Sequence, residues 1–323
     1  MRSHRKIAIA LSSFALLATA ACGSGGAIDD ADDVGDQPTE ESSADDKGAL
    51  TLSGQNFTEM QVMAAMYEQV LTDAGYDVTT KLVTTRDIYI KQMSDGKVDV
   101  VPEYLAGITD FLHIQANGEN AKPVSSNDPQ ATLDALEPLA AEANITMLEP
   151  SQATNQNAFF VTKEFAADNN VETLSDLAKM DMPITLAAPE DCAGRSDCEG
   201  GLTEVYGLNI EEIIPTGFGG AATLESVKDG ESQLGETGTT DGSLEPQGLV
   251  LLEDDKGIQP AQNLTPAVNS DFLDANPDVA DALNELSATL TTEDLAQLNL
   301  QVDAERQKAA DVAESYLSDK GLI

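Results

Sequence analysis

Residues 87–101 of the chain, which read DIYIKQMSDGKVDVV, show the pattern that decides the fold. Residues 87–93 have the character of a helix, and the short apolar run at 98–101 is typical of a buried strand. The same succession of helix and strand continues on both sides of this stretch. Strands that alternate with helices indicate an α/β architecture with mostly parallel sheets, and we predict this fold class for the chain.

The helix that precedes this stretch has the clearest amphipathic pattern. Thr58 can cap it, and the pattern ends before Gly75. Its apolar face carries Met60, Met63, Met66, Tyr67, Val70 and Leu71. Methionines at helical spacing are far more often core residues than parts of a cofactor site, so we assign this face to the core.

Further elements follow toward the C-terminus. Helices are expected at 130–143, 174–180 and 221–227, and strands at 145–148, 158–162, 184–187 and 249–252. In the tail, Asn276 is expected to cap a helix that has Pro277 at its first position. Thr291 and Asp294 match a capping box for a later helix.

The N-terminal residues indicate the compartment. Arg2, Arg5 and Lys6 precede an uncharged apolar run at 7–21. This run is too short, and too closely followed by polar sequence, for a comfortable transmembrane span. We therefore predict that residues 1–21 are a signal peptide and that the mature chain is extracytoplasmic.

The residues around Cys22 resemble the lipobox of bacterial lipoproteins. Ala20 and Ala21 stand directly before Cys22, although Thr19 occupies a position where that pattern prefers Leu. We predict that lipid on Cys22 anchors the chain to the cell membrane. The alternative is an ordinary secretory signal followed by an incidental cysteine.

The charge of the chain excludes one class of partner. Acidic residues outnumber basic ones 57 to 17, which gives a formal net charge of −40. Nucleic-acid binding requires clustered Lys and Arg, so no nucleic-acid partner is expected. Residues 23–48 contain nine acids against Lys47 and almost nothing to bury, so residues 22–48 are predicted to be a disordered tether.

The remaining cysteines suggest a disulfide. If Cys22 carries lipid, Cys192 and Cys198 are left as a pair six positions apart. A bridge there would stabilise the fold by about 2 kcal/mol and would mainly fix the shape of its short loop. A metal site is the competing interpretation, but two cysteines with no nearby histidine make a poor one.

Catalytic motifs are not recognisable in the sequence. His113 is the only histidine after the signal peptide, and no nucleophile motif stands beside it. A phosphate loop, a dinucleotide fingerprint and zinc-ligand spacing are also not found. We predict that the protein is not an enzyme and uses no cofactor, and we interpret His113 as structural.

Four short stretches stand out in their order and spacing. They are 54–59 (GQNFTE), 96–104 (GKVDVVPEY), 188–190 (APE) followed by Arg195, 201–202 and 206–207, and 239–242 (TTDG) followed by 251–256 (LLEDDK). Together they resemble the osmoprotectant-binding proteins of ABC transporters, which take up glycine betaine, carnitine or choline. The likeness covers residues 49–323, including the C-terminal helices.

This resemblance implies a two-lobed, type II periplasmic-binding fold with a ligand cleft and two crossing segments. Lobe 1 is expected to hold residues 49–153 and 241–323, and lobe 2 to hold residues 154–240. A monomer would close on a small solute and deliver it to an ABC permease and its ATPase.

The resemblance also implies a ligand site. A quaternary ammonium is held by aromatic faces, and a carboxylate needs cationic or N–H donors. Tyr104 matches a cage tyrosine, Phe159 stands where a second cage aromatic is usual, and Arg195 matches a carboxylate-binding arginine. Gln55, Asn56, Phe218 and Thr239 complete the expected set. The alternatives are packing roles for the two aromatics and a surface role for Arg195.

Several positions depart from the pattern of the family. Leu105-Ala106-Gly107 replaces its usual Thr-Gly-Thr, and Gly238 stands where a cage tyrosine is common. The stretch 219–224 has no aromatic residue, so Phe218 could substitute only if its loop shifts. The resemblance nevertheless predicts a quaternary amine such as glycine betaine as the solute. The alternatives are a different small polar solute, or a sensory or surface lipoprotein that does not transport.

Overall fold

The computed structural model describes residues 47–323. The predicted signal peptide, Cys22 and most of the predicted tether lie outside the described residues. Among the helices of the described part, none combines the length and the apolar character that a membrane span requires.

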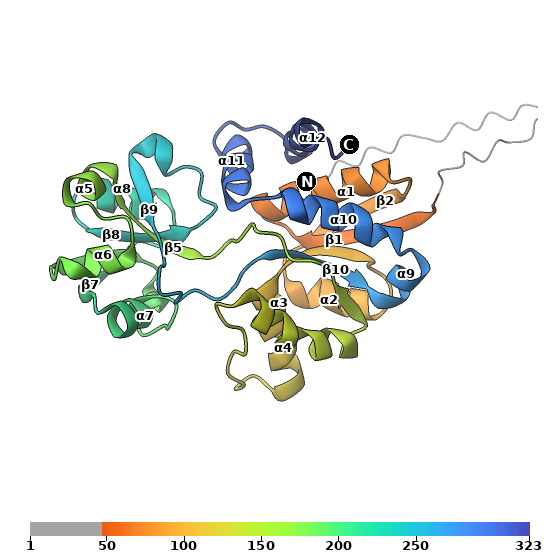
Figure 1. The fold of residues 1–323 in the computed structure, drawn as a ribbon, viewed down its shortest axis with the longest axis horizontal. Coiled ribbons are helices and arrows are strands. Elements are labelled where there is room, and N and C mark those ends of the chain that lie inside the picture. Colours follow the sequence, from red (N-terminus) through yellow and green to blue (C-terminus); the bar gives the residue numbers. More distant parts are fainter. Residues whose placement is uncertain (1–46) are drawn as a thin grey trace, which may run out of the picture. The chain divides into compact units, whose positions relative to one another are not determined.

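Two five-stranded mixed sheets organise the described chain (Figure 1). The first has the order β2-β1-β3-β10-β4, and its strands are β1 (Ala49–Gln55), β2 (Asp77–Val83), β3 (Val100–Tyr104), β4 (Ile145–Met147) and β10 (Leu264–Asn269). The second has the order β7-β6-β8-β5-β9, and its strands are β5 (Asn157–Thr162), β6 (Pro183–Ala188), β7 (Asn209–Pro215), β8 (Leu234–Gly238) and β9 (Leu249–Leu252). We call the first sheet with its helices lobe 1 and the second lobe 2.

The prediction of mostly parallel sheets is wrong, because half of the strand pairings are antiparallel. β1 pairs in parallel with β2 and β3, and β6 pairs in parallel with β7 and β8. All antiparallel pairings involve β5 or β10. These are the strands through which the chain enters one sheet from the other, and each runs against its neighbours. The α/β class itself is confirmed.

The helices surround the two sheets. Those of lobe 1 are α1 (Thr58–Asp73), α2 (Arg86–Ser94), α3 (Leu105–Asn117), α4 (Pro129–Glu142), α9 (Ser270–Ala275), α10 (Asp278–Thr289), α11 (Thr292–Asp303) and α12 (Ala309–Lys320). Those of lobe 2 are α5 (Lys163–Asn169), α6 (Leu174–Lys179), α7 (Glu199–Gly201) and α8 (Ala221–Lys228), with a π-helical turn at Leu202–Tyr206 and 3₁₀ turns at Glu190–Cys192 and Glu245–Gln247.

The predicted core face of α1 is confirmed, but its capping residue is not. Met60, Met63, Met66, Tyr67, Val70 and Leu71 are all buried in one cluster of lobe 1. Phe57 is the N-cap residue, and its side chain makes no capping hydrogen bond. The hydroxyl of Thr58 instead donates to Asp303 Oδ1 at 2.6 Å, because Thr58 is already the first helical residue.

The two cap predictions in the tail have different outcomes. The Thr291–Asp294 capping box is present at the start of α11. Asn276 is instead the C-cap residue of α9, and Pro277 is the N-cap residue of α10, so the predicted start is one residue early. The side-chain amide of Asn276 donates to Phe272 O at 2.9 Å and is engaged with the preceding helix.

Each lobe has its own apolar core. In lobe 1, one buried cluster includes α1, α10, α11 and α12, and another includes α2, α3 and α4. In lobe 2, the larger cluster contains Phe159, Cys192 and Cys198, and a smaller one contains Phe160 and Leu224. The two folding units of the prediction therefore have a physical basis in separate cores.

Two crossing segments, 148–156 and 253–263, join the lobes and run side by side (Figure 1). Backbone hydrogen bonds connect them, among them Asn155 N to Gln262 O at 3.2 Å. The predicted return to lobe 1 at residue 241 is wrong, because β9 pairs with β5 in the second sheet. The chain leaves lobe 2 only after Leu252.

Candidate functional site

A cleft of about 450 Å³ lies between the two lobes. We call it the interlobe cleft, and six of its lining residues carry the argument: Phe57, Glu59, Asn155, Phe218, Asp241 and Asp303. They come from the loop between β1 and α1, the first turn of α1, the first crossing segment, the loop between β7 and α8, the loop after β8, and the end of α11. Both lobes therefore contribute to the wall of the cleft.

Two exposed phenylalanines, one from each lobe, line the interlobe cleft. Phe57 is 40% exposed and Phe218 is 49% exposed, so each presents a large part of its ring to the solvent. Phe218 lies in a loop of glycines in which Gly219 has φ +60°, and a Cβ at Gly219 would lie 2.5 Å from Thr237 Oγ1. The backbone at residue 219 therefore requires glycine.

Tyr104 lies behind Phe57, and the two rings stack with centroids 6.5 Å apart and an interplanar angle of 10°. Tyr104 is only 9% exposed and does not line the cleft. Its hydroxyl donates to Glu59 Oε1. Burial and the neighbouring Glu59 raise the pKa of Tyr104 well above its usual range. The expected cage tyrosine thus supports Phe57 and Glu59 in this structure.

Glu59 is a buried carboxylate, 3% exposed, at the wall of the interlobe cleft. Besides the Tyr104 hydroxyl, Asn155 Nδ2 donates to its Oε1 at 3.0 Å and Asn299 Nδ2 donates to its Oε2 at 2.7 Å. All three donors are neutral. Asn155 belongs to the first crossing segment, so Glu59 connects lobe 1 to the segment that leads to lobe 2.

Two more carboxylates line the cleft, at Asp241 and Asp303. Asp241 Oδ2 accepts from Thr237 Oγ1 at 2.7 Å, and its Oδ1 accepts from the hydroxyl of Ser243 at 2.6 Å. Asp303 is bonded to Thr58 as described above. Among the described residues that line the cleft there is no Lys, Arg or His. The electrostatic environment of the cleft is therefore anionic.

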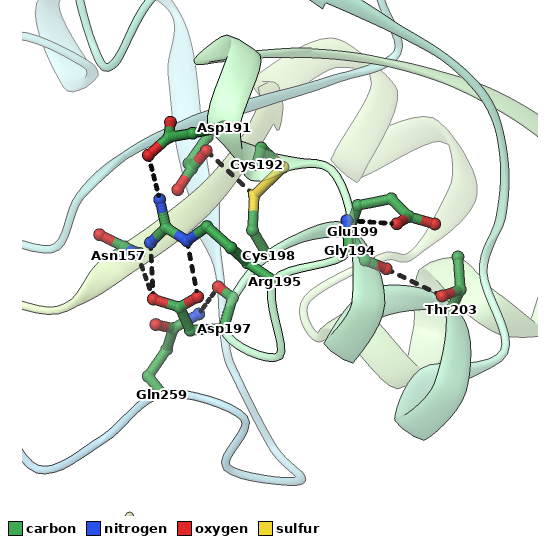
Figure 2. Close-up of a disulfide and its surroundings, with 11 residues drawn as sticks. Asn157, Asp191, Cys192, Gly194, Arg195, Asp197, Cys198, Glu199, Thr203 and Gln259 are labelled. Atoms are coloured by element: carbon green, nitrogen blue, oxygen red, sulfur yellow. Dashed lines mark hydrogen bonds and ion pairs between the residues drawn. A yellow bond between two sulfur atoms is a disulfide. The ribbon is translucent and has the colours of Figure 1, made fainter. Parts of the chain in front are cut away.

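Arg195 does not line the interlobe cleft, and acidic partners occupy its guanidinium (Figure 2). Its Nε and Nη2 donate to the two carboxylate oxygens of Asp197 at 2.9 and 2.6 Å, and its Nη1 donates to Asp191 at 3.3 Å. The hydrogen bond with Asp197 raises the pKa of Arg195 further. The structure thus pairs the predicted carboxylate-binding arginine within its own loop.

Cys192 and Cys198 are joined by a disulfide that closes this loop (Figure 2). Gln259 Nε2, from the second crossing segment, donates to the backbone oxygen of Asp197 at 2.8 Å. Both sulfurs are engaged in the bridge and are not available as thiolates for the competing metal site. The disulfide and Gln259 hold the Arg195 loop against the crossing segment.

Glu236, on β8, is buried beside the disulfide, with Oε2 at 3.1 Å from Cys198 Sγ. Burial raises its pKa to about 7, and the nearby Arg195 guanidinium opposes the shift. Its Oε1 has no hydrogen-bond partner in the described part of the chain. A carboxyl in such surroundings favours its neutral form.

Phe159 and Thr239 line a second hollow of about 880 Å³, which borders β9 and which we call the β9 hollow. Phe159 is 1% exposed and belongs to the core of lobe 2, and Thr239 donates to the backbone oxygen of Thr154 at 2.7 Å. The β9 hollow and the interlobe cleft share only Asp241 and Gly242.

The remaining predicted residues lie outside both hollows. Gln55 ends β1, and the exposed Asn56 accepts from Gln61 Nε2 at 2.9 Å. His113 lies on α3, where its backbone oxygen accepts from Asn117 Nδ2 at 3.0 Å. Phe218 is thus the one predicted site residue that lines the interlobe cleft.

Sequence reasoning missed five of the six cleft residues named above: Phe57, Glu59, Asn155, Asp241 and Asp303. Phe57 and Glu59 stand inside the 54–59 motif and could have been selected as an aromatic and an acid directly after a strand. Asp303 meets Thr58 across 245 positions of sequence, and no local signal connects the two.

Comparisons with known proteins agree with this architecture. Residues 48–319 match the family described as the substrate-binding domain of the ABC-type glycine betaine transport system. A glycine-betaine-binding protein of Pseudomonas aeruginosa is 26% identical over 85% of this chain and 88% of its own length. A carnitine transport binding protein of Listeria monocytogenes is 23% identical over 84% of this chain and 86% of its own length.

Solved structures show the same fold. Unliganded YehZ from Escherichia coli superposes with a TM-score of 0.74 at 24% identity, and the match covers 85% of this chain and 99% of that one. A structure described as a glycine betaine/carnitine/choline ABC transporter gives a TM-score of 0.73 at 21% identity, with 84% and 99% covered. The chain therefore belongs to the family of substrate-binding domains of ABC-type glycine betaine transport systems.

Proposed function

We propose that the chain captures a quaternary-amine osmoprotectant outside the cell membrane and delivers it to an ABC permease with a cytoplasmic ATPase. The observation that carries this proposal is the pair of exposed rings, Phe57 and Phe218, which face an anionic cleft from separate lobes. A quaternary ammonium has no hydrogen to donate, and aromatic faces and negative charge are what stabilise it. The family itself serves transport, and its members bind small solutes rather than transform them.

Capture in this proposal follows from movement of the lobes about the two crossing segments. Closing the lobes would bring Phe57 and Phe218 onto opposite sides of the ligand and remove water from between them. Removal of water strengthens the attraction between cation and ring. Tyr104 supports Phe57 from behind, so we assign it a positioning role, with direct contact possible only if Phe57 moves aside.

The other predicted site residues have roles that closure could change. Phe159 and Thr239 would shape lobe 2 near the crossing segments, and Gln55 and Asn56 would shape the approach to α1. Arg195 could meet a ligand only after it exchanges Asp197 for that ligand. We assign these residues to the margin of the site rather than to its centre.

The proposal includes the predicted maturation of the N-terminus. Cleavage before Cys22 and lipid on its thiol would anchor a monomeric binding domain to the outer face of the cell membrane through the acidic tether. Mass spectrometry of the mature N-terminus tests this directly. A diacylglyceryl-modified Cys22 is expected, and a mature chain released without lipid would contradict the anchor.

Calorimetric titration of the full chain with glycine betaine, carnitine, choline and proline tests the binding function. Saturable one-to-one binding of at least one quaternary amine, with weaker or no binding of proline, is the expected result. The absence of binding for every quaternary amine would refute the proposed function and would direct the search to other small solutes.

A further inference from the structure

We infer that the interlobe cleft selects a net cation, a quaternary ammonium without a carboxylate, over a zwitterionic betaine. This inference rests on the proposed function and defines its substrate class more narrowly. It depends on the balance of charge around the cleft, on the partners that each charged group already has, and on a buried acceptor with no partner.

The charges at the cleft have one sign. Glu59, Asp241 and Asp303 line it, and the described residues of its wall include no Lys, Arg or His. A ligand with a positive charge and no negative charge is attracted by all three carboxylates. The ammonium end of a zwitterion is attracted in the same way. Its carboxylate, however, must give up its hydration beside other negative charges, which costs free energy.

Glu59 is the strongest of the three contributors because it is buried. Tyr104, Asn155 and Asn299 donate to it, and within residues 47–323 no Lys or Arg forms an ion pair with it. Removing a carboxylate from water without an ionic partner carries a large free-energy cost, which hydrogen bonds offset only in part. A bound cation would supply the counter-charge that the described part of the chain does not place beside Glu59.

Asn299 adds an independent observation. It lines the cleft and is 8% exposed, and its Oδ1 has no hydrogen-bond partner among the residues that the structure describes. Its Nδ2 donates to Glu59, which leaves the negative end of the amide dipole unmatched. Buried acceptors without partners are rare in folded proteins. The unmatched oxygen of a residue that lines the cleft adds negative potential there, which favours a positively charged occupant and disfavours a carboxylate.

Two positively charged groups that a ligand carboxylate would need, the N-terminus of α1 and Arg195, already have acidic neighbours. The N-terminus of α1 carries partial positive charge, but Glu59 lies in its first turn and Asp303 accepts from Thr58. Arg195 in lobe 2 is paired with Asp197 and Asp191. If closure brings the Arg195 loop to the ligand, one guanidinium arrives together with two carboxylates.

Titration of the full chain with choline and with glycine betaine, in the same buffer, tests the inference. The two ligands share the trimethylammonium group and differ in the carboxylate. Choline is expected to bind at least about tenfold more tightly, which corresponds to about 1.4 kcal/mol. Equal affinity, or tighter binding of glycine betaine, would overturn the inference and leave the proposed function in place. No binding of either ligand would remove the proposed function and the inference together.

Two variants assign the selectivity to the carboxylates. Glu59→Gln is expected to weaken the binding of choline at least about fivefold. It should also reduce the ratio of choline affinity to glycine betaine affinity, because one negative charge that repels the betaine carboxylate is removed. If Glu59→Gln does not fold, Asp303→Asn serves instead, since an asparagine oxygen can still accept from Thr58. Glu119→Gln, an exposed acid outside the cleft, controls for the change in overall charge. An unchanged choline to betaine ratio in a folded Glu59→Gln or Asp303→Asn variant would contradict the inference.

Discussion

Replacement of Phe218 by leucine separates the aromatic contribution to binding from the apolar one. Leucine keeps an apolar side chain at the cleft but removes the ring, and with it the quadrupole that attracts a cation. Phe218 is 49% exposed and belongs to neither core of lobe 2, so the free energy of unfolding should change by less than about 0.5 kcal/mol. A change of more than about 0.5 kcal/mol in the free energy of choline binding then reports on the binding site and not on folding.

The expected magnitude follows from one ring facing one ammonium. A single cation–π contact contributes about 0.5 kcal/mol when exposed and about 2 kcal/mol when water is excluded. Phe218→Leu should therefore raise the Kd for choline by about two- to thirtyfold, and the upper end applies if the lobes close fully.

The assay compares choline with its neutral analogue 3,3-dimethyl-1-butanol, in which carbon replaces nitrogen. Calorimetric titration of the parent chain and Phe218→Leu gives four dissociation constants. Choline should lose affinity, and the neutral analogue, which makes only apolar contacts, should lose little. Equal losses for the two ligands would refute the cation–π assignment, and an unchanged Kd for choline would remove Phe218 from the site.

Three further predictions concern the stability of lobe 2. Cys192→Ser combined with Cys198→Ser should lower the free energy of unfolding by about 2 kcal/mol in chemical denaturation, since the closed loop is short; an unchanged midpoint would contradict a stabilising role. Burial raises the pKa of Glu236 to about 7 from its ordinary value of 4.5. Between these two pH values the folded state therefore keeps a proton on Glu236 that the unfolded state has already released. Stability should fall as pH rises from about 4.5 to about 7, by up to about 3 kcal/mol, and Glu236→Gln should flatten this dependence; an identical pH profile in the variant would argue against it. Gly219→Ala should destabilise by roughly 1 kcal/mol or more, because alanine at positive φ is strained and its Cβ would meet Thr237, and full stability with unchanged choline binding would show that the loop adapts.

The elements that could be predicted from sequence were those with strong local patterns. The core face of α1 and the Thr291–Asp294 capping box depend on residues a few positions apart, and both are present. β8 was missed because its sequence, LGETG, has no apolar run, although every residue in it is buried. The error at residue 241 has a similar cause, since the pairing of β9 with β5 is a long-range contact.

The candidate site was harder to predict, because its residues meet through tertiary structure. Tyr104 was selected as a cage face, yet the ring of Phe57 stacks on it and takes the exposed position. Arg195 has the charge that a carboxylate needs, but Asp197, only two positions away, occupies its guanidinium. A sequence pattern shows which charged groups are available, whereas the structure shows which of them already have partners.

A crystal structure of the chain with bound choline would test the account most directly. We expect the trimethylammonium group to lie in the interlobe cleft between the rings of Phe57 and Phe218, on the side of Glu59. Density for the ligand in the β9 hollow beside Phe159 and Thr239, or in neither hollow, would contradict the assignment of the site.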